Sequence, residues 1–126
     1  MLGAMEITGT DFVLVPTRDI EVAHEFYAGV LGLECSSRYD RVPGGEYETG
    51  TLTLQLLEVE KIGRTFAPTT GVIALHVEDV AAAREELEAQ GVSFHGETID
   101  SGVCHMAIFA DPDGNPLLLH HRYAPR

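Results

Sequence analysis

Histidine and cysteine are the residue types of this sequence that could do chemistry near neutral pH. His76 and His120 each lie in a short apolar run, and Cys104 begins a third. An imidazole can act as a general base near neutral pH, and imidazole and thiolate together are good zinc ligands. The spacing of these three residues resembles no compact ligand motif, and a single strand histidine is more often structural. A general base, a zinc ligand and a structural role therefore stay open for His76 and His120.

The two cysteines predict neither a nucleophile nor a disulfide framework. Cys35 and Cys104 lack a local cysteine–histidine signature, and two cysteines are too few to staple a chain of 126 residues. We interpret both as reduced thiols, which are typical of a cytoplasmic protein. The sequence contains no glycine-rich phosphate loop, and His24 is expected at the surface.

The elements that must position these side chains occur twice along the chain. Each copy reads strand, aspartate, helix, glycine, strand. Aspartate is a good N-cap because its carboxylate accepts from the free amides of the first helical turn, and glycine ends a helix at low conformational cost. The first copy has a strand at 12–16, Asp19, a helix over 20–31 and Gly32; the second has a strand at 72–77, Asp79, a helix over 80–90 and Gly91.

Three strands follow each helix, so each half of the chain is predicted to be a βαβββ module. Pro43-Gly44-Gly45 and the stretch 111–115 are predicted turns. One module with a single helix buries little surface, so the two should pack as one α+β domain with helices outside and sheets facing each other. The predicted later strands are 33–39, 47–49 and 52–59 in the first module, and 92–97, 103–110 and 117–121 in the second.

Charge and hydropathy exclude several classes of partner. Twenty acidic residues outnumber eight basic ones, which gives a formal charge of -12. This charge repels nucleic acids and anionic membranes and attracts cationic small molecules. No apolar run approaches the roughly 18 residues of a membrane span, and the N-terminal residues lack the pattern of a signal peptide. We therefore expect a cytoplasmic globular protein that binds neither nucleic acid nor membrane.

Two stretches of the chain resemble the glyoxalase, bleomycin-resistance and extradiol-dioxygenase superfamily, also called the vicinal oxygen chelate fold. They are 19–33, which contains FY and VLGL, and 109–116, which reads FADPDGNP. The resemblance covers about 10–121 and implies one domain of paired, curved mixed sheets around a cup for a small molecule, assembled as a homodimer. Its parts are an N-terminal extension at 1–9, a module at about 10–60, a linker at 61–70, a module at about 71–121 and a tail at 122–126.

Enzymes of this family usually hold a divalent metal in the cup. The four ligand positions fall on Phe12, Gln55, Val72 and Leu118, and three of these side chains have no lone pair to offer a metal. A shift of one residue in the outer strands adds only Asp11 as a possible ligand. The resemblance therefore implies the metal-free branch, whose best-known members bind and sequester antibiotics, and we expect no metal and no cofactor.

Strand alternation extends the cup from these four positions. Neighbours two residues away share a face, so the predicted lining is mainly apolar with a few polar groups, and His105 should point the other way. Tyr39, Tyr47 and Phe66 lie on or near loops that could rim the cup or form a dimer contact. The predicted lining residues are Phe12, Leu14, Thr53, Gln55, Leu57, Val72, Ala74, His76, Cys104, Met106, Ile108, Leu118 and His120.

Three functions remain open on these grounds. The first is a non-catalytic protein that binds a neutral or cationic, partly aromatic molecule such as an antibiotic, because no predicted lining residue is Lys or Arg. The second is an enzyme of the same superfamily: a glyoxalase-like lyase or isomerase that uses His76 or His120, or a dioxygenase-type enzyme with rearranged metal ligands. The third is a structural or regulatory partner with a degenerate cup.

Overall fold

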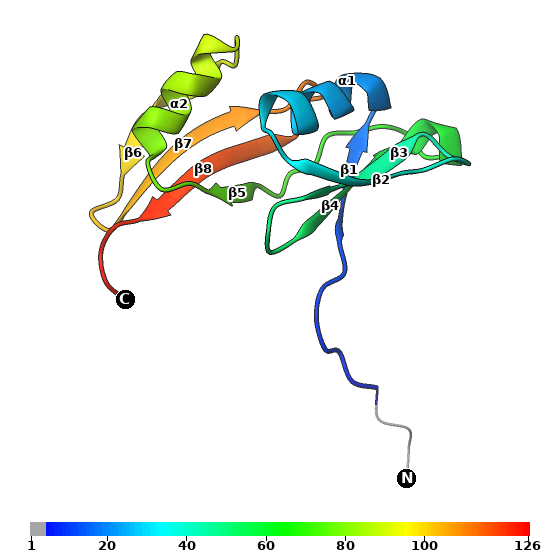
Figure 1. Ribbon diagram of the computed structural model, residues 1–126, viewed down its shortest axis with the longest axis horizontal. Helices are drawn as coiled ribbons and strands as arrows, with labels where there is room; N and C mark the ends of the chain where they lie inside the picture. Colours follow the sequence, from blue (N-terminus) through cyan, green and yellow to red (C-terminus); the bar gives the residue numbers. More distant parts are fainter. Residues whose placement is uncertain (1–4) are drawn as a thin grey trace.

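The computed structural model describes residues 5–126, and residues 1–4 of the expected N-terminal extension lie outside the described residues. Two four-stranded mixed sheets form the architecture (Figure 1). Their strand orders are β1-β4-β3-β2 and β5-β8-β7-β6. The parallel pairs are β1 with β4 and β5 with β8, the first and last strands of each module in chain order, and the other neighbours are antiparallel. This repeated topology confirms the predicted α+β fold of two βαβββ modules.

The elements follow the predicted order, with small differences in their bounds. The first module contains β1 (Val13–Thr17), α1 (Ile20–His24), a π-helical segment η1 (Glu25–Val30), β2 (Glu34–Arg38), β3 (Gly44–Glu48), β4 (Thr53–Glu58) and a 3-10 turn η2 (Val59–Ile62). The second module contains β5 (Ile73–His76), α2 (Val80–Ala89), β6 (Phe94–Asp100), β7 (Cys104–Ala110) and β8 (Pro116–Arg122). In the part of the chain that the structure describes, neither helix has the length and apolar character to cross a membrane.

Both predicted N-caps are present. The Asp19 carboxylate accepts from the backbone N–H of Glu21 at 2.9 Å, and that of Asp79 from Ala82 at 3.0 Å. The first helix differs from the prediction because it widens into a π-helical segment after His24. A π turn holds one more residue than an α turn. Two consecutive aromatic side chains, Phe26 and Tyr27, are buried on this segment.

Gly44 and Gly45 were predicted to form a turn, but they lie in β3. An added Cβ at Gly44 would lie 2.8 Å from the backbone oxygen of Leu56, and one at Gly45 would lie 2.9 Å from the backbone oxygen of Ser37. No real Cβ atom tolerates such distances without a shift of the neighbouring strand. Close approach of β3 to its neighbours, rather than chain reversal, therefore explains this glycine pair.

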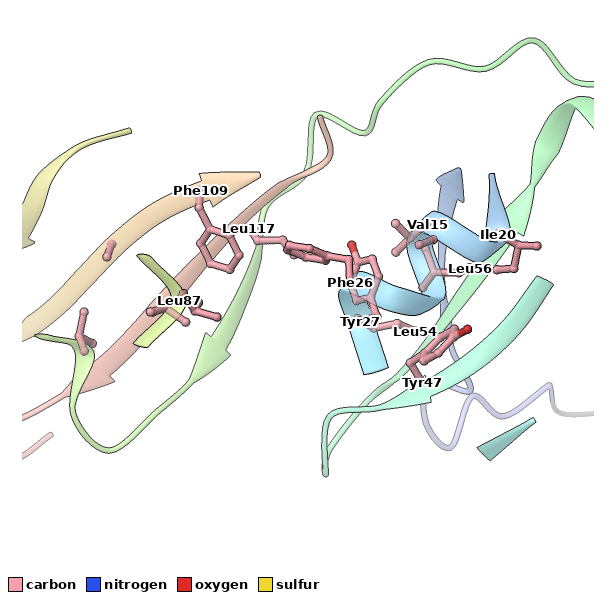
Figure 2. Packing of buried hydrophobic residues seen from close by; sticks show 14 residues of the cluster. Val15, Ile20, Phe26, Tyr27, Tyr47, Leu54, Leu56, Leu87, Phe109 and Leu117 are labelled. Atoms are coloured by element: carbon pink, nitrogen blue, oxygen red, sulfur yellow. The ribbon is translucent and has the colours of Figure 1, made fainter. Parts of the chain in front are cut away.

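The hydrophobic core lies between the helices and one face of each sheet. Figure 2 shows Phe26 and Tyr27 between Leu117 of the second sheet and Leu54 of the first. Tyr47, a candidate rim residue, is fully buried in this core. Its hydroxyl lies 2.8 Å from Nδ1 of His24, which is half-buried and reaches the core from the surface.

A buried polar network joins the turn between β7 and β8 to the first module. Asp111 accepts hydrogen bonds from the Tyr27 hydroxyl at 2.7 Å and from Asn115 Nδ2 at 2.8 Å. The Thr17 hydroxyl donates to the carboxylate of Asp113 at 2.5 Å. These five residues are called the latch below. Because its bonds join residues that are 84 and 96 positions apart, the latch holds the two modules together.

The latch satisfies polar groups that would otherwise be costly to bury. Asp111 Oδ1 accepts from the backbone N–H groups of Asp113 and Asn115, both at 2.9 Å. Asn115 Nδ2 also donates to the Pro16 carbonyl oxygen at 2.8 Å. Burial, followed by the charge of Asp111, raises the pKa of Tyr27 far above its ordinary value. The phenol therefore keeps its proton and remains a donor to Asp111.

Replacing the latch tyrosine should destabilise the protein. Tyr27→Phe removes a hydroxyl from a buried carboxylate, and we expect unfolding to become easier by about 1–3 kcal/mol, measured by urea denaturation. Tyr123→Phe is the matched control, because Tyr123 also donates to an aspartate at 2.7 Å but is exposed. An equal effect of the two substitutions would contradict the structural importance of the latch.

Alkaline pH should weaken the fold through its buried phenols. Burial raises the pKa of Tyr47 to about 12 and that of Tyr27 further. The unfolded chain loses these protons near pH 10. The contribution of the two tyrosines to the free energy of unfolding is therefore constant below that pH, and above it falls by up to about 1.4 kcal/mol per pH unit for each tyrosine. Denaturation between pH 8 and 11 should show this fall, with a smaller slope for Tyr27→Phe. A slope unchanged by that substitution would argue against this origin.

Candidate functional site

The predicted lining residues lie on the two sheet faces turned away from the helices, here called the open faces. Helices cover one face of each sheet, and the opposite faces are free of them (Figure 1). On the first open face, Leu14 lies opposite Gln55 in the register of β1 and β4. On the second, Leu118 lies between Ala74 and Ile108. By strand alternation, the first face carries Leu14, Thr53, Gln55 and Leu57, and Phe12 lies one residue before β1; the second carries Ala74, Cys104, Met106, Ile108, Leu118 and His120, while Val72 lies one residue before β5 and His76 ends that strand.

Each set is brought together within its own sheet, and both faces remain accessible in the single chain. Phe12 is 48% exposed and Val72 is 50% exposed, although both are large apolar residues. Leu57 is buried, since it packs beside Gly44 and Tyr39. The open faces are therefore half-covered surfaces within one chain.

Two carboxylates on the first open face were missed by the sequence analysis. Glu46 and Glu48 lie opposite Gln55 and Thr53 in the register of β3 and β4. The predicted strand begins at Tyr47, after a predicted turn at the glycine pair, so alternation within it does not reach Glu46. The pattern Glu46-Tyr47-Glu48, with a buried residue between two polar ones, was the signal that could have found them.

Hydrogen bonds hold these carboxylates in a polar row. Tyr39 donates its hydroxyl hydrogen to Glu46 at 2.5 Å and accepts from Gln55 Nε2 at 3.0 Å. Burial and the bond to Glu46 raise the pKa of Tyr39, so the phenol remains the donor. Glu48 accepts from the hydroxyls of Ser36 at 2.5 Å and Thr53 at 2.6 Å, and these bonds lower its pKa. The row presents fixed negative charge beside apolar side chains.

The histidines and Cys104 do not form the zinc cluster that was left open above. His120 lies between His76 and Met106 in the register of the second sheet. Among residues 5–126, Cys104 belongs to no group of metal-binding side chains close enough to share an ion. His105 lies off the second open face, as expected, with its ring 4.7 Å from that of Tyr123.

The four positions that correspond to the family's metal ligands do not fit a metal. Phe12, Val72 and Leu118 offer only hydrocarbon, whichever way their side chains turn. Gln55 uses its amide nitrogen to donate to Tyr39, which leaves one carbonyl oxygen as a donor atom. A single neutral oxygen is too weak a ligand set for a divalent cation.

A cavity of about 520 Å³ lies between the modules on the helix side of β5. Its wall is formed mainly by apolar residues of η1, β5 and α2, including Leu31, Leu75 and Ala83. Ala74 and His76 are the predicted lining residues that reach it. Its volume suits a small molecule, and Thr49, Thr51, His76 and Glu86 are the polar side chains of its wall.

Comparison with known proteins agrees with this architecture. TnmS3, an antibiotic binding protein from Streptomyces sp. CB03234, is 25% identical with a TM-score of 0.80, and the match covers 94% of this chain and 99% of that one. SMU.1112c is 26% identical with a TM-score of 0.74, over 92% of this chain and 100% of that one. A putative glyoxalase family protein from Bacillus anthracis shares the fold at 20% identity, with a TM-score of 0.77 and coverage of 94% and 98%.

No curated protein sequence gives a significant match to this chain. The sequence profile of one family, however, matches residues 9–119, which is nearly all of both modules. This match agrees with the repeated βαβββ topology and with the FADPDGNP stretch that supplies the latch. The chain therefore belongs to the Glyoxalase/Bleomycin resistance protein/Dioxygenase superfamily.

Proposed function

We propose that this protein is a non-catalytic, metal-independent binding protein for a cationic, partly aromatic small molecule. The acidic row of the first open face is the observation that carries the proposal. Glu46 and Glu48 share one sheet face with the apolar side chain of Leu14, and Gln55 lies between Leu14 and Glu46 in the register of β1, β4 and β3. A cation finds a carboxylate partner there, and an aromatic group finds apolar area worth roughly 25 cal/mol per Å² buried.

The polar partners of Glu46 support recognition rather than chemistry. Tyr39 donates to that carboxylate and accepts from Gln55, so the carboxylate is held in one orientation, which lowers the entropy lost when a ligand binds. None of the predicted lining residues on the first open face is Lys or Arg, so a phosphate or carboxylate ligand on that face would lose its hydration beside Glu46 and Glu48 without gaining a charge partner there. The formal charge of -12 adds a field that attracts cations.

Two further observations support a binding role without a metal. The side chains at the family's metal positions are Phe12, Gln55, Val72 and Leu118, which cannot supply a ligand set. TnmS3, which is described as an antibiotic binding protein, matches the chain over almost its entire length. An antibiotic or another cationic aromatic compound is the class of ligand that these features favour.

The cup is completed by a second copy of the chain in this proposal. The accessible surface of the chain is 7963 Å², whereas a compact monomer of 13.7 kDa exposes about 6,600 Å². The extended segment before β1 contributes part of this excess (Figure 1). Exposed apolar residues on both open faces, Phe12 and Val72, supply another part. A homodimer covers these residues and encloses the ligand.

Charge favours pairing of the first open face with the second. The first carries Glu46 and Glu48, while the second carries His120 and, two residues later on β8, Arg122. Two copies of the acidic face would repel each other. A two-fold dimer lets the acidic face of each chain meet the second open face of its partner, so both cups are identical.

Removing one carboxylate should weaken ligand binding. The experiment is calorimetry of EDTA-treated protein with metal-free bleomycin and other cationic aromatic compounds. We expect binding that Glu46→Gln lowers at least tenfold, because the charge is lost and the shape is kept. Glu97→Gln is the matched control on the exposed strand β6. Ala83→Leu, which fills the cavity between the modules, should leave the affinity unchanged.

Other outcomes of the same screen would contradict the proposal. If glutathione conjugates, acyl-CoA thioesters or phosphonates bind while cationic aromatics do not, the ligand class is wrong and an enzyme of this superfamily becomes the better interpretation. If Ala83→Leu abolishes binding and Glu46→Gln does not, the ligand occupies the cavity between the modules.

The oligomeric state can be tested by light scattering and by one paired substitution. The wild-type protein should have twice the 13.7 kDa mass of the chain at micromolar concentration. Val72→Asp should give monomers, because it places a charge against the partner's acidic face. Val22→Asp is the matched control on α1, where the valine is 47% exposed. A monomeric wild type, or equal dissociation of both variants, would refute the dimer.

A further inference from the structure

Three potential metal ligands meet at the end of the second sheet, away from the family's metal positions. His76 ends β5, Glu78 follows two residues later, and His121 lies on the neighbouring strand β8. One donor atom from each residue lies within 4.8 Å of the other two. His76 Nε2 is 3.0 Å from Glu78 Oε1, and the two imidazole rings are 5.7 Å apart.

The position of His76 explains how these side chains meet. Strand alternation assigns His76 and His121 to opposite faces of the sheet. However, β5 is an edge strand and ends at His76, so the chain is already leaving the sheet there. The His76 ring is free to approach Glu78 and His121 around this edge.

The donor set matches one metal class better than others. Two imidazoles and one carboxylate form the three-ligand set of open zinc sites, in which water takes the fourth position. Calcium and magnesium prefer oxygen ligands only. In a tetrahedral zinc site with bonds of about 2.0–2.2 Å, ligand atoms are roughly 3.4 Å apart, so small side-chain rotations suffice here.

The surroundings of the three residues are compatible with a bound cation. His121 Nδ1 is buried and has no hydrogen-bond partner among the described residues. A pocket of about 370 Å³, lined partly by Glu78 and His121, provides space for a metal-bound water.

We propose that His76, Glu78 and His121 form a Zn²⁺ site at the end of the second sheet, away from the acidic row of the first open face. The site exchanges its ion readily, since His76 and Glu78 are exposed. It lies four residues along the chain from Val72, which precedes β5, and three from Leu118 in β8, the positions that the family resemblance assigns to metal ligands. It is independent of the proposed ligand and needs no metal in the cup.

Titration of tag-free, EDTA-dialysed protein with ZnCl₂ tests the site. Calorimetry should give about one ion per chain, and Co²⁺ as a spectroscopic probe should show the visible absorption of a nitrogen-ligated ion. His121→Ala and Glu78→Gln should each weaken Zn²⁺ binding at least tenfold. His95→Ala and Glu97→Gln, which change exposed residues on β6, are the matched controls and should bind as the wild type does.

Two results would overturn the site. One is the absence of stoichiometric Zn²⁺ binding to the wild-type protein. The other is wild-type affinity in both His121→Ala and Glu78→Gln. His76→Ala offers a third test at an exposed position, in case the half-buried His121 is needed for folding, and circular dichroism checks each variant. Cationic aromatic binding measured on Glu78→Gln and His121→Ala, which change residues outside the predicted lining, should not change, and this separates the site from the proposed ligand cup.

Discussion

The arrangement of the two modules depends on the hydrogen bonds to the buried Asp111 carboxylate. This carboxylate accepts from Tyr27 of the first module and from Asn115 of its own turn, and Asn115 in turn donates to the end of β1. A buried carboxylate without these donors would be strongly unfavourable. The network therefore fixes the position of the second module relative to the first. This is the structural role of the turn at 111–115, which lies away from the open faces.

This constraint separates the stabilising side of each sheet from the side available for function. Helices and aromatic residues such as Phe26 and Phe109 fill the space on one side, where the core lies. The other side contains half-exposed apolar residues and the polar row around Glu46. Because the core is complete without them, side chains on the open faces can vary with the ligand while the fold is retained.

Acidic and imidazole groups occupy different parts of the molecule, which separates the two proposed sites. The row around Glu46 lies on β3 and β4, beside apolar surface that suits an organic cation. The group of His76, Glu78 and His121 lies at the end of the second sheet, where Asp79, Thr98 and His105 line the pocket beside Glu78 and His121. Charge alone attracts cations to both sites, but the neighbouring side chains determine whether an aromatic molecule or a metal ion is the better ligand.

The sequence by itself determined the repeated modules, both helix caps and the open-face positions of Leu14, Gln55 and Leu118, because capping and strand alternation are local rules. It also excluded metal ligation at the family positions, since Phe12, Val72 and Leu118 lack donor atoms in any conformation. Only the tertiary structure decided that Gly44 and Gly45 belong to a strand, and this placed Glu46 on the open face. It also decided that His76 meets His121 rather than forming a cluster with Cys104, because the end of an edge strand departs from ideal alternation. Distances between residues remote in the chain depend on how the modules pack, and no local pattern encodes them.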